Sequence, residues 1–375
     1  ITGEARNLIH LMEDFVPRAI RNNPKEVRKA YLKAGVEISD KSMDMYHIDT
    51  EAVIKSGDTD SLYLSHSQVV TAFPESRNLT YHQKAVITVS LHKDFLDGAN
   101  NQFMSDYYES RGVDSIHEFE LETIASTGFW LDVKKRYAQS ISWKDGKFFK
   151  EEDQPIKSKG LEIIKASYPP LARTLLKGYF KEILQSPDGK YADKMELHAG
   201  LFKLTNEYKN IWCSKGDTVE TIDEICPTSS VNGYFNYVLN DVPPDEEEEN
   251  KGSKYPEFAL KTPAHVKGLA YYNWFRQGYL NTGKYTIKEA GDPVYGGKCR
   301  VYLTKQTKYL PKHTPFAYIP KACPQWALGK DSPVPIDKVR MFEKCVIDPI
   351  NRILVPIGMP KLSAYDNEGV QLSLF

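Results

Sequence analysis

The sequence predicts an α+β fold in which short antiparallel hairpins pack with helices. Two stretches predict hairpins. In residues 53–64 apolar runs flank Gly57, and in residues 134–150 a strand-like run meets the turn pair Asp145-Gly146. Helices are predicted where apolar residues recur every three or four positions, as in residues 171–183.

Length and composition narrow the class of protein. The 375 residues are enough for two or three domains with sizeable cores. The formal net charge is −1, so any basic surface must be local. The five cysteines are widely spaced without a C-x-x-C pair, which favours reduced thiols in the cytoplasm over disulfides or structural zinc. No run approaches 18 apolar residues, and no charged-then-apolar leader is present, so we expect no membrane partner.

The first 125 residues alternate between predicted helices and short strands. A helical period covers residues 2–20 and stops at Asn22-Asn23-Pro24, and residues 24–50 mix helix and loop. After the first hairpin we expect a strand at residues 85–91 and a helix at 94–111. Residues 119–125 alternate acidic and apolar residues, which predicts a strand with both acidic side chains on one face.

The second half is predicted to be richer in helices. Beyond Pro169-Pro170 the helical pattern runs to Gln185, and further helices are expected at about 192–209 and 271–280. Strands are predicted at 294–303 and 305–310. A long helical pattern follows at residues 334–353, interrupted by Pro349.

Two carboxylates occupy the tip of the first hairpin. Residues two apart on a strand point the same way, so Asp58 and Asp60 are predicted to face one small volume. Their repulsion raises the pKa of one carboxyl group, and a divalent cation removes that cost. Hard oxygen ligands suit Mg²⁺, or alternatively Mn²⁺. An Asp-x-Asp pair by itself is also compatible with a solvated turn.

The full string Gly-Asp-Thr-Asp-Ser-Leu-Tyr at residues 57–63, set between two strands, resembles motif C of family B DNA polymerases. Later motifs follow in the family's order, and the likeness is to the T-even-type bacteriophage replicative polymerases in particular. The resemblance implies a helix following the fingers (1–25), a palm of antiparallel sheet with packed helices (26–168), a mostly helical thumb (169–360) and a clamp-binding tail (361–375). It also implies that the hairpin tip holds two Mg²⁺ ions, with Asp60 as a direct ligand and Asp58 assisting.

Lys134-Lys135-Arg136-Tyr137 resembles the family's Lys-Lys-x-Tyr signature. Lysine ammonium groups donate to minor-groove acceptors and phosphates, which gives a grip that is independent of sequence. The resemblance implies that Lys134, Lys135 and Tyr137 place the primer end. Without it, a run of three cations is typical of a solvated face.

Weaker matches add further candidate residues. An acidic pair beside the catalytic hairpin of the phage enzymes corresponds to Glu120 and Glu122, which are expected to contribute electrostatic field rather than obligatory metal ligation. The alternative is a half-exposed strand whose carboxylates face water. Residues 157–162 resemble the element before the thumb, which implicates Lys159, Gly160 and Glu162 in DNA binding.

Two more segments match the phage enzymes. Residues 229–233 and 262–268 resemble the thumb tip, which makes His265 and Lys267 candidate phosphate contacts, although a lone histidine is more often structural. The final peptide resembles a sliding-clamp-binding motif through Gln371, Leu372, Leu374 and Phe375. The alternative is a tail folded back on its own domain.

Several family features are missing from this sequence. It lacks motif A with its partner aspartate, the fingers helix that grips the incoming triphosphate, and the exonuclease acidic residues. The chain also opens on Ile1 rather than Met, which favours a processed piece or one part of a longer product. We therefore expect the carboxyl-terminal part of a DNA-templated DNA polymerase, located in the host cytoplasm if it is phage-encoded.

The expected partners are an amino-terminal polymerase part, primer-template DNA, dNTP and a sliding clamp. The expected reaction is two-metal nucleotidyl transfer in DNA replication. One alternative is a non-catalytic, polymerase-derived DNA- and clamp-binding module that merely inherited the acidic hairpin. A less favoured alternative is an unrelated magnesium-dependent hydrolase, because no His/Asp cluster accompanies the hairpin in the sequence.

Overall fold

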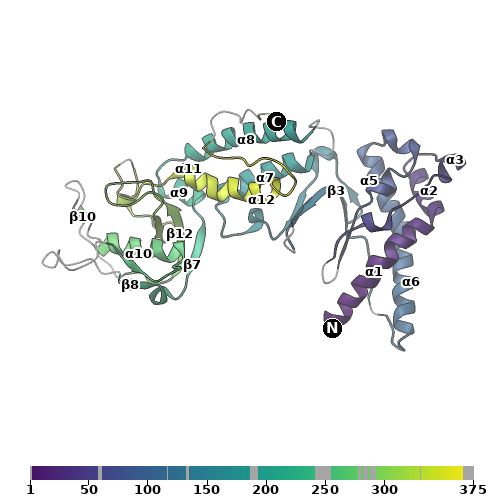
Figure 1. The fold of residues 1–375 in the computed structure, drawn as a ribbon, viewed down its shortest axis with the longest axis horizontal. Helices are drawn as coiled ribbons and strands as arrows, with labels where there is room; N and C mark the ends of the chain where they lie inside the picture. Colours follow the sequence, from purple (N-terminus) through teal and green to yellow (C-terminus); the bar gives the residue numbers. More distant parts are fainter. Residues whose placement is uncertain are drawn as a thin grey trace. The chain divides into compact units, whose positions relative to one another are not determined.

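The computed structural model describes residues 2–57, 61–115, 117–131, 135–185, 193–240, 255–277, 280–281, 286–287, 293–329 and 331–365. The chain divides into two compact units, residues 1–157 and 158–375, and each is described by itself. The fold is mixed α+β, as predicted, with helices and antiparallel strand pairs in both units (Figure 1). The predicted palm–thumb boundary at residue 168 lies within the second unit.

In the first unit, helices precede and follow a short hairpin along the chain, and a larger sheet comes after them. Its elements in chain order are α1 (Thr2–Asn22), α2 (Pro24–Lys33), α3 (Asp40–Met43), η1 (Thr50–Ala52), β1 (Ile54–Gly57), β2 (Leu62–Leu64), α4 (Ser67–Val70), η2 (Pro74–Asn78), α5 (Tyr81–Leu91), η3 (His92–Leu96), α6 (Asp97–Glu109), β3 (Thr123–Trp130), β4 (Tyr137–Lys144), β5 (Lys147–Phe148), η4 (Glu151–Asp153) and β6 (Ile156–Lys159), which crosses the unit boundary.

The second unit begins with long helices and continues with a sheet covered by a helix. Its elements are η5 (Glu162–Ile164), α7 (Pro170–Gln185), α8 (Lys194–Cys213), α9 (Val219–Ile225), β7 (Thr228–Val231), η7 (Tyr234–Asn236), β8 (Val238–Asn240), β9 (Glu257–Phe258), α10 (Ala264–Gln277), β10 (Leu280–Asn281), β11 (Thr286–Ile287), β12 (Gly297–Leu303), β13 (Pro315–Tyr318), η9 (Gln325–Ala327), α11 (Lys338–Phe342), η10 (Glu343–Ile347) and α12 (Asp348–Leu354).

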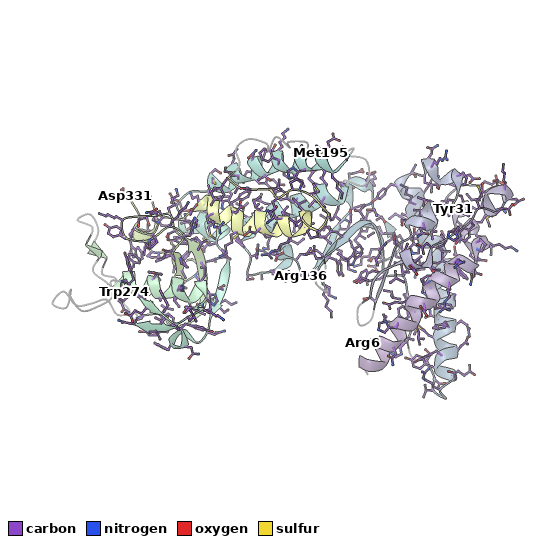
Figure 2. The ribbon with its side chains drawn as sticks, viewed as in Figure 1. Arg6, Tyr31, Arg136, Met195, Trp274 and Asp331 are labelled. Carbon is purple, nitrogen blue, oxygen red and sulfur yellow. The ribbon has the colours of Figure 1, made fainter. Side chains whose placement is uncertain are left out.

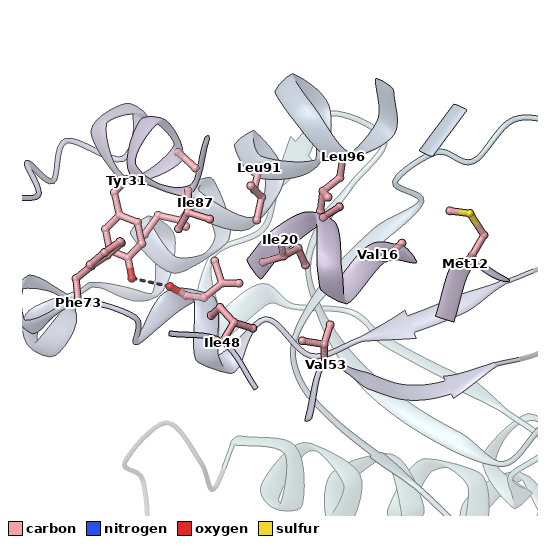
Figure 3. Packing of buried hydrophobic residues seen from close by; sticks show 14 of the residues in the cluster. Met12, Val16, Ile20, Tyr31, Ile48, Val53, Phe73, Ile87, Leu91 and Leu96 are labelled. Carbon is pink, nitrogen blue, oxygen red and sulfur yellow. Dashed lines mark hydrogen bonds between the residues drawn. The ribbon is translucent and has the colours of Figure 1, made fainter. Parts of the chain in front are cut away.

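The core of the first unit forms between α1 and the elements that follow it. Met12, Val16 and Ile20 recur along one face of α1 and are buried with side chains of α2, α5 and η3 (Figure 3). Each such side chain contributes about 1.5–3 kcal/mol when fully buried. On a neighbouring face α1 lies beside α6 (Figure 1), where Phe15 stacks on Phe103 with ring centroids 4.3 Å apart.

The strand predicted at residues 85–91 is wrong, because this segment forms α5. Thr80 caps the helix: its hydroxyl accepts from the Gln83 backbone N–H while the Gln83 side chain accepts from the Thr80 N–H. Ala85, Thr88 and Leu91 are three positions apart and buried on one face. The β-branched run favoured a strand, but the cap and the helical burial pattern outweigh that preference.

Two hairpins of the first unit match the prediction. β1 pairs antiparallel with β2, with Gly57 opposite Leu62 and Ile54 opposite Leu64. β4 pairs with β3 over most of its length and continues through the turn at Asp145-Gly146 into β5. β6 pairs with β4 on its other side. We call residues 54–64 the acidic hairpin and residues 123–144 the lysine hairpin.

The sheet of the second unit is ordered β13-β12-β7 and carries α10 on one face (Figure 1). A Cβ at Gly268 of α10 would lie 3.0 Å from the Ala317 backbone nitrogen and from the Phe316 carbonyl carbon of β13. The missing side chain therefore lets helix and sheet backbones approach closely.

The strand predicted at 305–310 is wrong. These residues form bends, and only Thr304 before them makes an isolated bridge, to Ile336.

The predicted interruption at Pro349 is wrong, because the helix continues through it. α11 passes through the π-helical turn η10 directly into α12, and Pro349 lies just after that turn, where the spacing of the helical hydrogen bonds changes. The long helices α7 and α8 pack nearby in the same unit, where the Tyr179 and Thr205 hydroxyls lie 2.7 Å apart in the interior.

The five cysteines are free thiols, as the sequence predicted, and all except Cys213 are buried. No helix in the described part of the chain is both long and apolar enough to cross a membrane.

Candidate functional site

The acidic hairpin has the two paired antiparallel strands predicted for it. β1 ends at Gly57 and β2 begins at Leu62, and these two residues are paired. The predicted metal ligands Asp58 and Asp60 belong to the connection between them and lie outside the described residues.

Gly57 has a different role from the one the sequence suggested. We expected it to supply turn geometry, but it is the last paired residue of β1, and its φ lies outside the left-handed region. Its hydrogen faces α1 instead. A Cβ there would lie 2.7 Å from Glu13 Oε1 and 3.3 Å from Ile9 Cγ2. Glu13 also contacts His10, with its Oε2 2.8 Å from His10 Nδ1. A carboxylate of α1 thus lies beside the residue that precedes Asp58.

The lysine hairpin carries the Lys-Lys-x-Tyr signature at its turn. Lys134 lies outside the described residues. Lys135 is exposed and has a φ of 62°, a left-handed conformation that is uncommon for a lysine. Arg136 (labelled in Figure 2) accepts a hydrogen bond at its carbonyl from the Leu131 N–H, at 2.9 Å, which closes the turn. The hairpin therefore holds Lys135 at the solvent side of its turn.

Tyr137 is buried, with 5% of its surface exposed. Its hydroxyl accepts a hydrogen bond at 2.9 Å from the hydroxyl of Tyr63, a residue of the acidic hairpin 74 positions earlier. Trp130, which pairs with Tyr137 across the β3–β4 ladder, completes a cluster of three rings. The ring centroids of Tyr63 lie 5.2 Å from Tyr137 and 5.8 Å from Trp130.

The surroundings of Tyr63 raise the pKa of its hydroxyl group. Burial, and then its hydrogen bond to Tyr137, raise the pKa of Tyr63 to about 12, although Lys157 and a hydrogen bond with Ser61 oppose this. Tyr63 consequently stays protonated and able to donate throughout the physiological range.

The acidic pair Glu120 and Glu122 does not lie on a strand, contrary to the prediction. β3 begins only at Thr123, which pairs with Lys144 at the end of β4, so no strand lies opposite the residues before it. Both glutamates are exposed. Glu122 Oε1 accepts from Lys157 Nζ at 2.7 Å, an exposed ion pair of the kind that contributes less than about 1 kcal/mol.

The candidate DNA contacts of the second unit differ in how exposed they are. Lys159 is exposed, and Gly160 has a φ of 69°, a left-handed conformation that glycine adopts without strain. Glu162 is buried, and it contacts Arg352 Nη1 at 3.1 Å and Lys165 Nζ at 3.5 Å. It therefore orients two cations of its own unit.

His265 and Lys267 lie at the start of α10, the helix that covers the sheet of the second unit. Burial lowers the pKa of His265, which leaves the ring neutral at pH 7 and weakens its attraction for phosphate. Lys267 Nζ lies 5.4 Å from the centroid of the Phe258 ring. The predicted clamp-binding residues Gln371, Leu372, Leu374 and Phe375 lie outside the described residues.

Sequence reasoning assigned no role to Tyr63, Trp130 or Glu13. Tyr63 was part of the motif string, and strand alternation places it on the face of Ser61, but nothing local indicates a partner 74 residues away. Glu13 belongs to a helix that was recognised only by its apolar positions.

The described residues contain no group of three or more His, Cys, Asp or Glu side chains able to hold a metal ion. Asp58 and Asp60 lie outside that search. No protein-family model matches this chain, and no curated protein matches it.

Proposed function

We propose that this chain is the carboxyl-terminal part of a family B DNA polymerase of the T-even phage type, with a palm, a mostly helical thumb and a sliding-clamp tail. In this proposal it contributes half of the active site, and an amino-terminal part supplies motif A, the fingers and the exonuclease. The reaction is template-directed transfer of a nucleotide from dNTP to a primer 3′-hydroxyl in DNA replication.

One observation supports the proposal most strongly. The two segments that resemble motif C and Lys-Lys-x-Tyr lie far apart in the sequence, yet both form hairpins, and the Tyr63–Tyr137 hydrogen bond joins them. A polymerase needs its metal ligands and its primer contacts in one small region. The contact between the two hairpins is what this requirement predicts.

In the proposal Asp58 and Asp60 form a magnesium site, and the chemistry of the donors supports this. Gly57 and Leu62 are paired, so the connection that carries Asp58 and Asp60 is short. Its donors are carboxylate oxygens, which Mg²⁺ prefers, and a further carboxylate, Glu13, lies beside Gly57. In the proposal Asp60 holds metal directly and Asp58 assists. When bound, two Mg²⁺ ions stabilise negative charge on the attacking and leaving oxygens; Mn²⁺ is an alternative.

The chain's own residues then position the substrates. Lys134 and Lys135 donate to primer phosphates and to minor-groove acceptors that every correct base pair presents. Tyr137 fixes the placement of the hairpin that carries them, and Glu120 and Glu122 add negative field nearby. The proposed DNA path along the second unit includes Lys159, Gly160, Glu162, His265 and Lys267. The tail beyond residue 370 is proposed to bind the clamp.

Primer extension tests the proposal. The chain alone and the chain mixed with its amino-terminal part are each given primer-template DNA, Mg²⁺ and dNTP. We expect extension only in the mixture, and none when Asp60→Ala replaces the wild type. Extension by the chain alone would contradict a shared active site.

The same experiment addresses the non-catalytic alternative. If the mixture binds DNA and a clamp without extending the primer, and Asp60→Ala leaves DNA binding unchanged, the chain is a DNA- and clamp-binding module that retains an inherited acidic hairpin.

A further inference from the structure

We infer that Tyr63 is a positioning residue for the proposed reaction. Its hydrogen bond to Tyr137 holds the acidic hairpin and the lysine hairpin in one arrangement, and both phenols act through the residues at the hairpin turns rather than by touching the primer. This inference rests on the proposed function and adds a residue and a mode of action to it.

Each of the two tyrosines belongs to a paired strand of its own hairpin. Tyr63 stands opposite Ser56 in the β1–β2 ladder, and Tyr137 stands opposite Trp130 in the β3–β4 ladder. The 2.9 Å bond between the two hydroxyl groups therefore joins residues that are each paired within a strand ladder of their own hairpin. Trp130 packs against both rings, so sliding of one hairpin past the other would break ring contacts as well as the bond.

The bond lies close to both functional ends. Tyr63 follows Asp60 by three positions, and Tyr137 follows Lys135 by two. At about 3.3 Å per extended residue, both are within about 10 Å along the chain. In this inference a shift between the hairpins changes the separation of the proposed metal ligands from the proposed primer contacts.

The burial of Tyr137 argues against direct contact with the primer. Only 5% of this residue is exposed, whereas Lys135 at the turn is exposed. The Tyr137 hydroxyl already accepts a hydrogen bond from the Tyr63 hydroxyl. Burial and this bond raise the pKa of Tyr63 to about 12, so the donor persists well above neutral pH. Lys135 is therefore the contact, and Tyr137 is the anchor that places it.

Three variants test the inference in the chain assembled with its amino-terminal part: Tyr63→Phe, Tyr137→Phe and the double variant. Tyr46→Phe is the matched control, because the Tyr46 hydroxyl donates to the Ile20 carbonyl in the same unit without joining the hairpins. The readouts are kcat for single-nucleotide addition, Kd for primer-template DNA, and thermal stability. Each single change removes the Tyr63–Tyr137 hydrogen bond and lowers stability, so stability alone does not decide the matter.

We expect Tyr63→Phe to lower kcat about tenfold and to change Kd less than about twofold, since misplacement by about 1 Å can cost about a hundredfold. Tyr137→Phe should match it, and the double variant should lose about tenfold rather than a hundredfold, because one bond is removed in all three. Tyr46→Phe should keep kcat within about twofold. If Tyr63→Phe does not fold, the double variant, which leaves neither hydroxyl unpaired, is compared with Tyr137→Phe.

Two results would overturn the inference alone. In one, Tyr63→Phe behaves like Tyr46→Phe while Tyr137→Phe weakens primer binding, which would make Tyr137 a direct contact. In the other, the losses of the two single variants multiply in the double variant. A wild-type mixture that does not extend primers overturns the proposed function, and this inference with it.

Discussion

Gly57 illustrates how one residue can serve a purpose that its neighbours in sequence do not reveal. Glycine before an Asp-x-Asp turn indicates a sharp bend, but here it makes room for Ile9 and Glu13 of α1. The consequence is that α1 sits directly against the last pair of the acidic hairpin. A carboxylate is thereby placed next to Gly57, the residue before Asp58, a feature that the apolar periodicity of α1 gave no reason to expect.

Gly57→Ala should destabilise the chain by about 1 kcal/mol, because Ile9 Cγ2 must yield and the flexible Glu13 carboxylate must swing aside. Adding Glu13→Ala should restore part of the loss, since the nearer obstacle is then absent. Urea unfolding of the two single variants and the double variant measures the coupling. Strictly additive losses would contradict the close approach described here.

His66 and His92 form a pair of contacting histidines in the first unit. Their Nε2 atoms lie 2.8 Å apart, and His92 Nδ1 lies 3.6 Å from Asp97, which Lys93 also contacts at 3.0 Å. Burial, and then the neighbouring His92, lower the pKa of His66 from 6.5 to about 3. The pair therefore stays hydrogen-bonded with a neutral His66 at physiological pH.

This lowered pKa predicts acid sensitivity. Below pH 6.5 the unfolded chain binds a proton at position 66 that the folded chain excludes until about pH 3, so the free energy of unfolding falls as the pH drops through this window. The limiting slope is about 1.4 kcal/mol per pH unit. Denaturation of the wild type and His66→Gln between pH 4 and 7 isolates the contribution. Parallel pH profiles for the two proteins would refute it.

At the scale of elements, α10 depends on a backbone-to-backbone contact. Because a Cβ at Gly268 would meet backbone atoms of β13 at 3.0 Å, no side-chain rotation relieves the clash. Gly268→Ala should therefore destabilise the second unit by about 1–3 kcal/mol. Gly98→Ala in α6 is the matched control, since nothing lies within 4 Å of its Cβ position and alanine favours a helix. Equal thermal stabilities of the two variants would contradict this packing.

The elements that the sequence predicted correctly are those with a strong local pattern. The helical periods of α1, α7 and α8, the turn at Asp145-Gly146 and the strand pair around Gly57 all follow from short-range chemistry. The failures occur where local preference conflicts with packing. In α5 a β-branched run is helical because a capping box and a buried face favour the helix, and residues 117–122 lack a partner strand.

For the candidate site, too, the sequence indicates the local features but not the long-range contacts. A motif string identifies Asp58, Asp60 and the Lys-Lys-x-Tyr residues, because their chemistry is encoded in consecutive positions. The contacts that join the two hairpins, Tyr63 to Tyr137 with Trp130 packed on both, are formed across 74 residues and leave no periodic trace. Long-range hydrogen bonds of this kind require the folded arrangement.

At the scale of the whole molecule, a chain of net charge −1 can bind DNA only through a local group of cations, and in the proposed function Lys134 and Lys135 belong to that group. The proposed function also gives a reason for two aspartates to occur within three residues in the acidic hairpin. Both features depend on the claim that Asp60 holds metal in an active site shared with another polymerase part.

The most direct test of that claim is the rate of single-nucleotide addition by the assembled protein in Mg²⁺, comparing Asp60→Ala with Asp114→Ala, an exposed aspartate outside the hairpins. Loss of a metal ligand removes several kcal/mol of charge stabilisation, so Asp60→Ala should lower the rate by at least about a thousandfold while Asp114→Ala stays within about twofold. A wild-type mixture that adds nucleotides at the same rate as its Asp60→Ala counterpart would contradict the account.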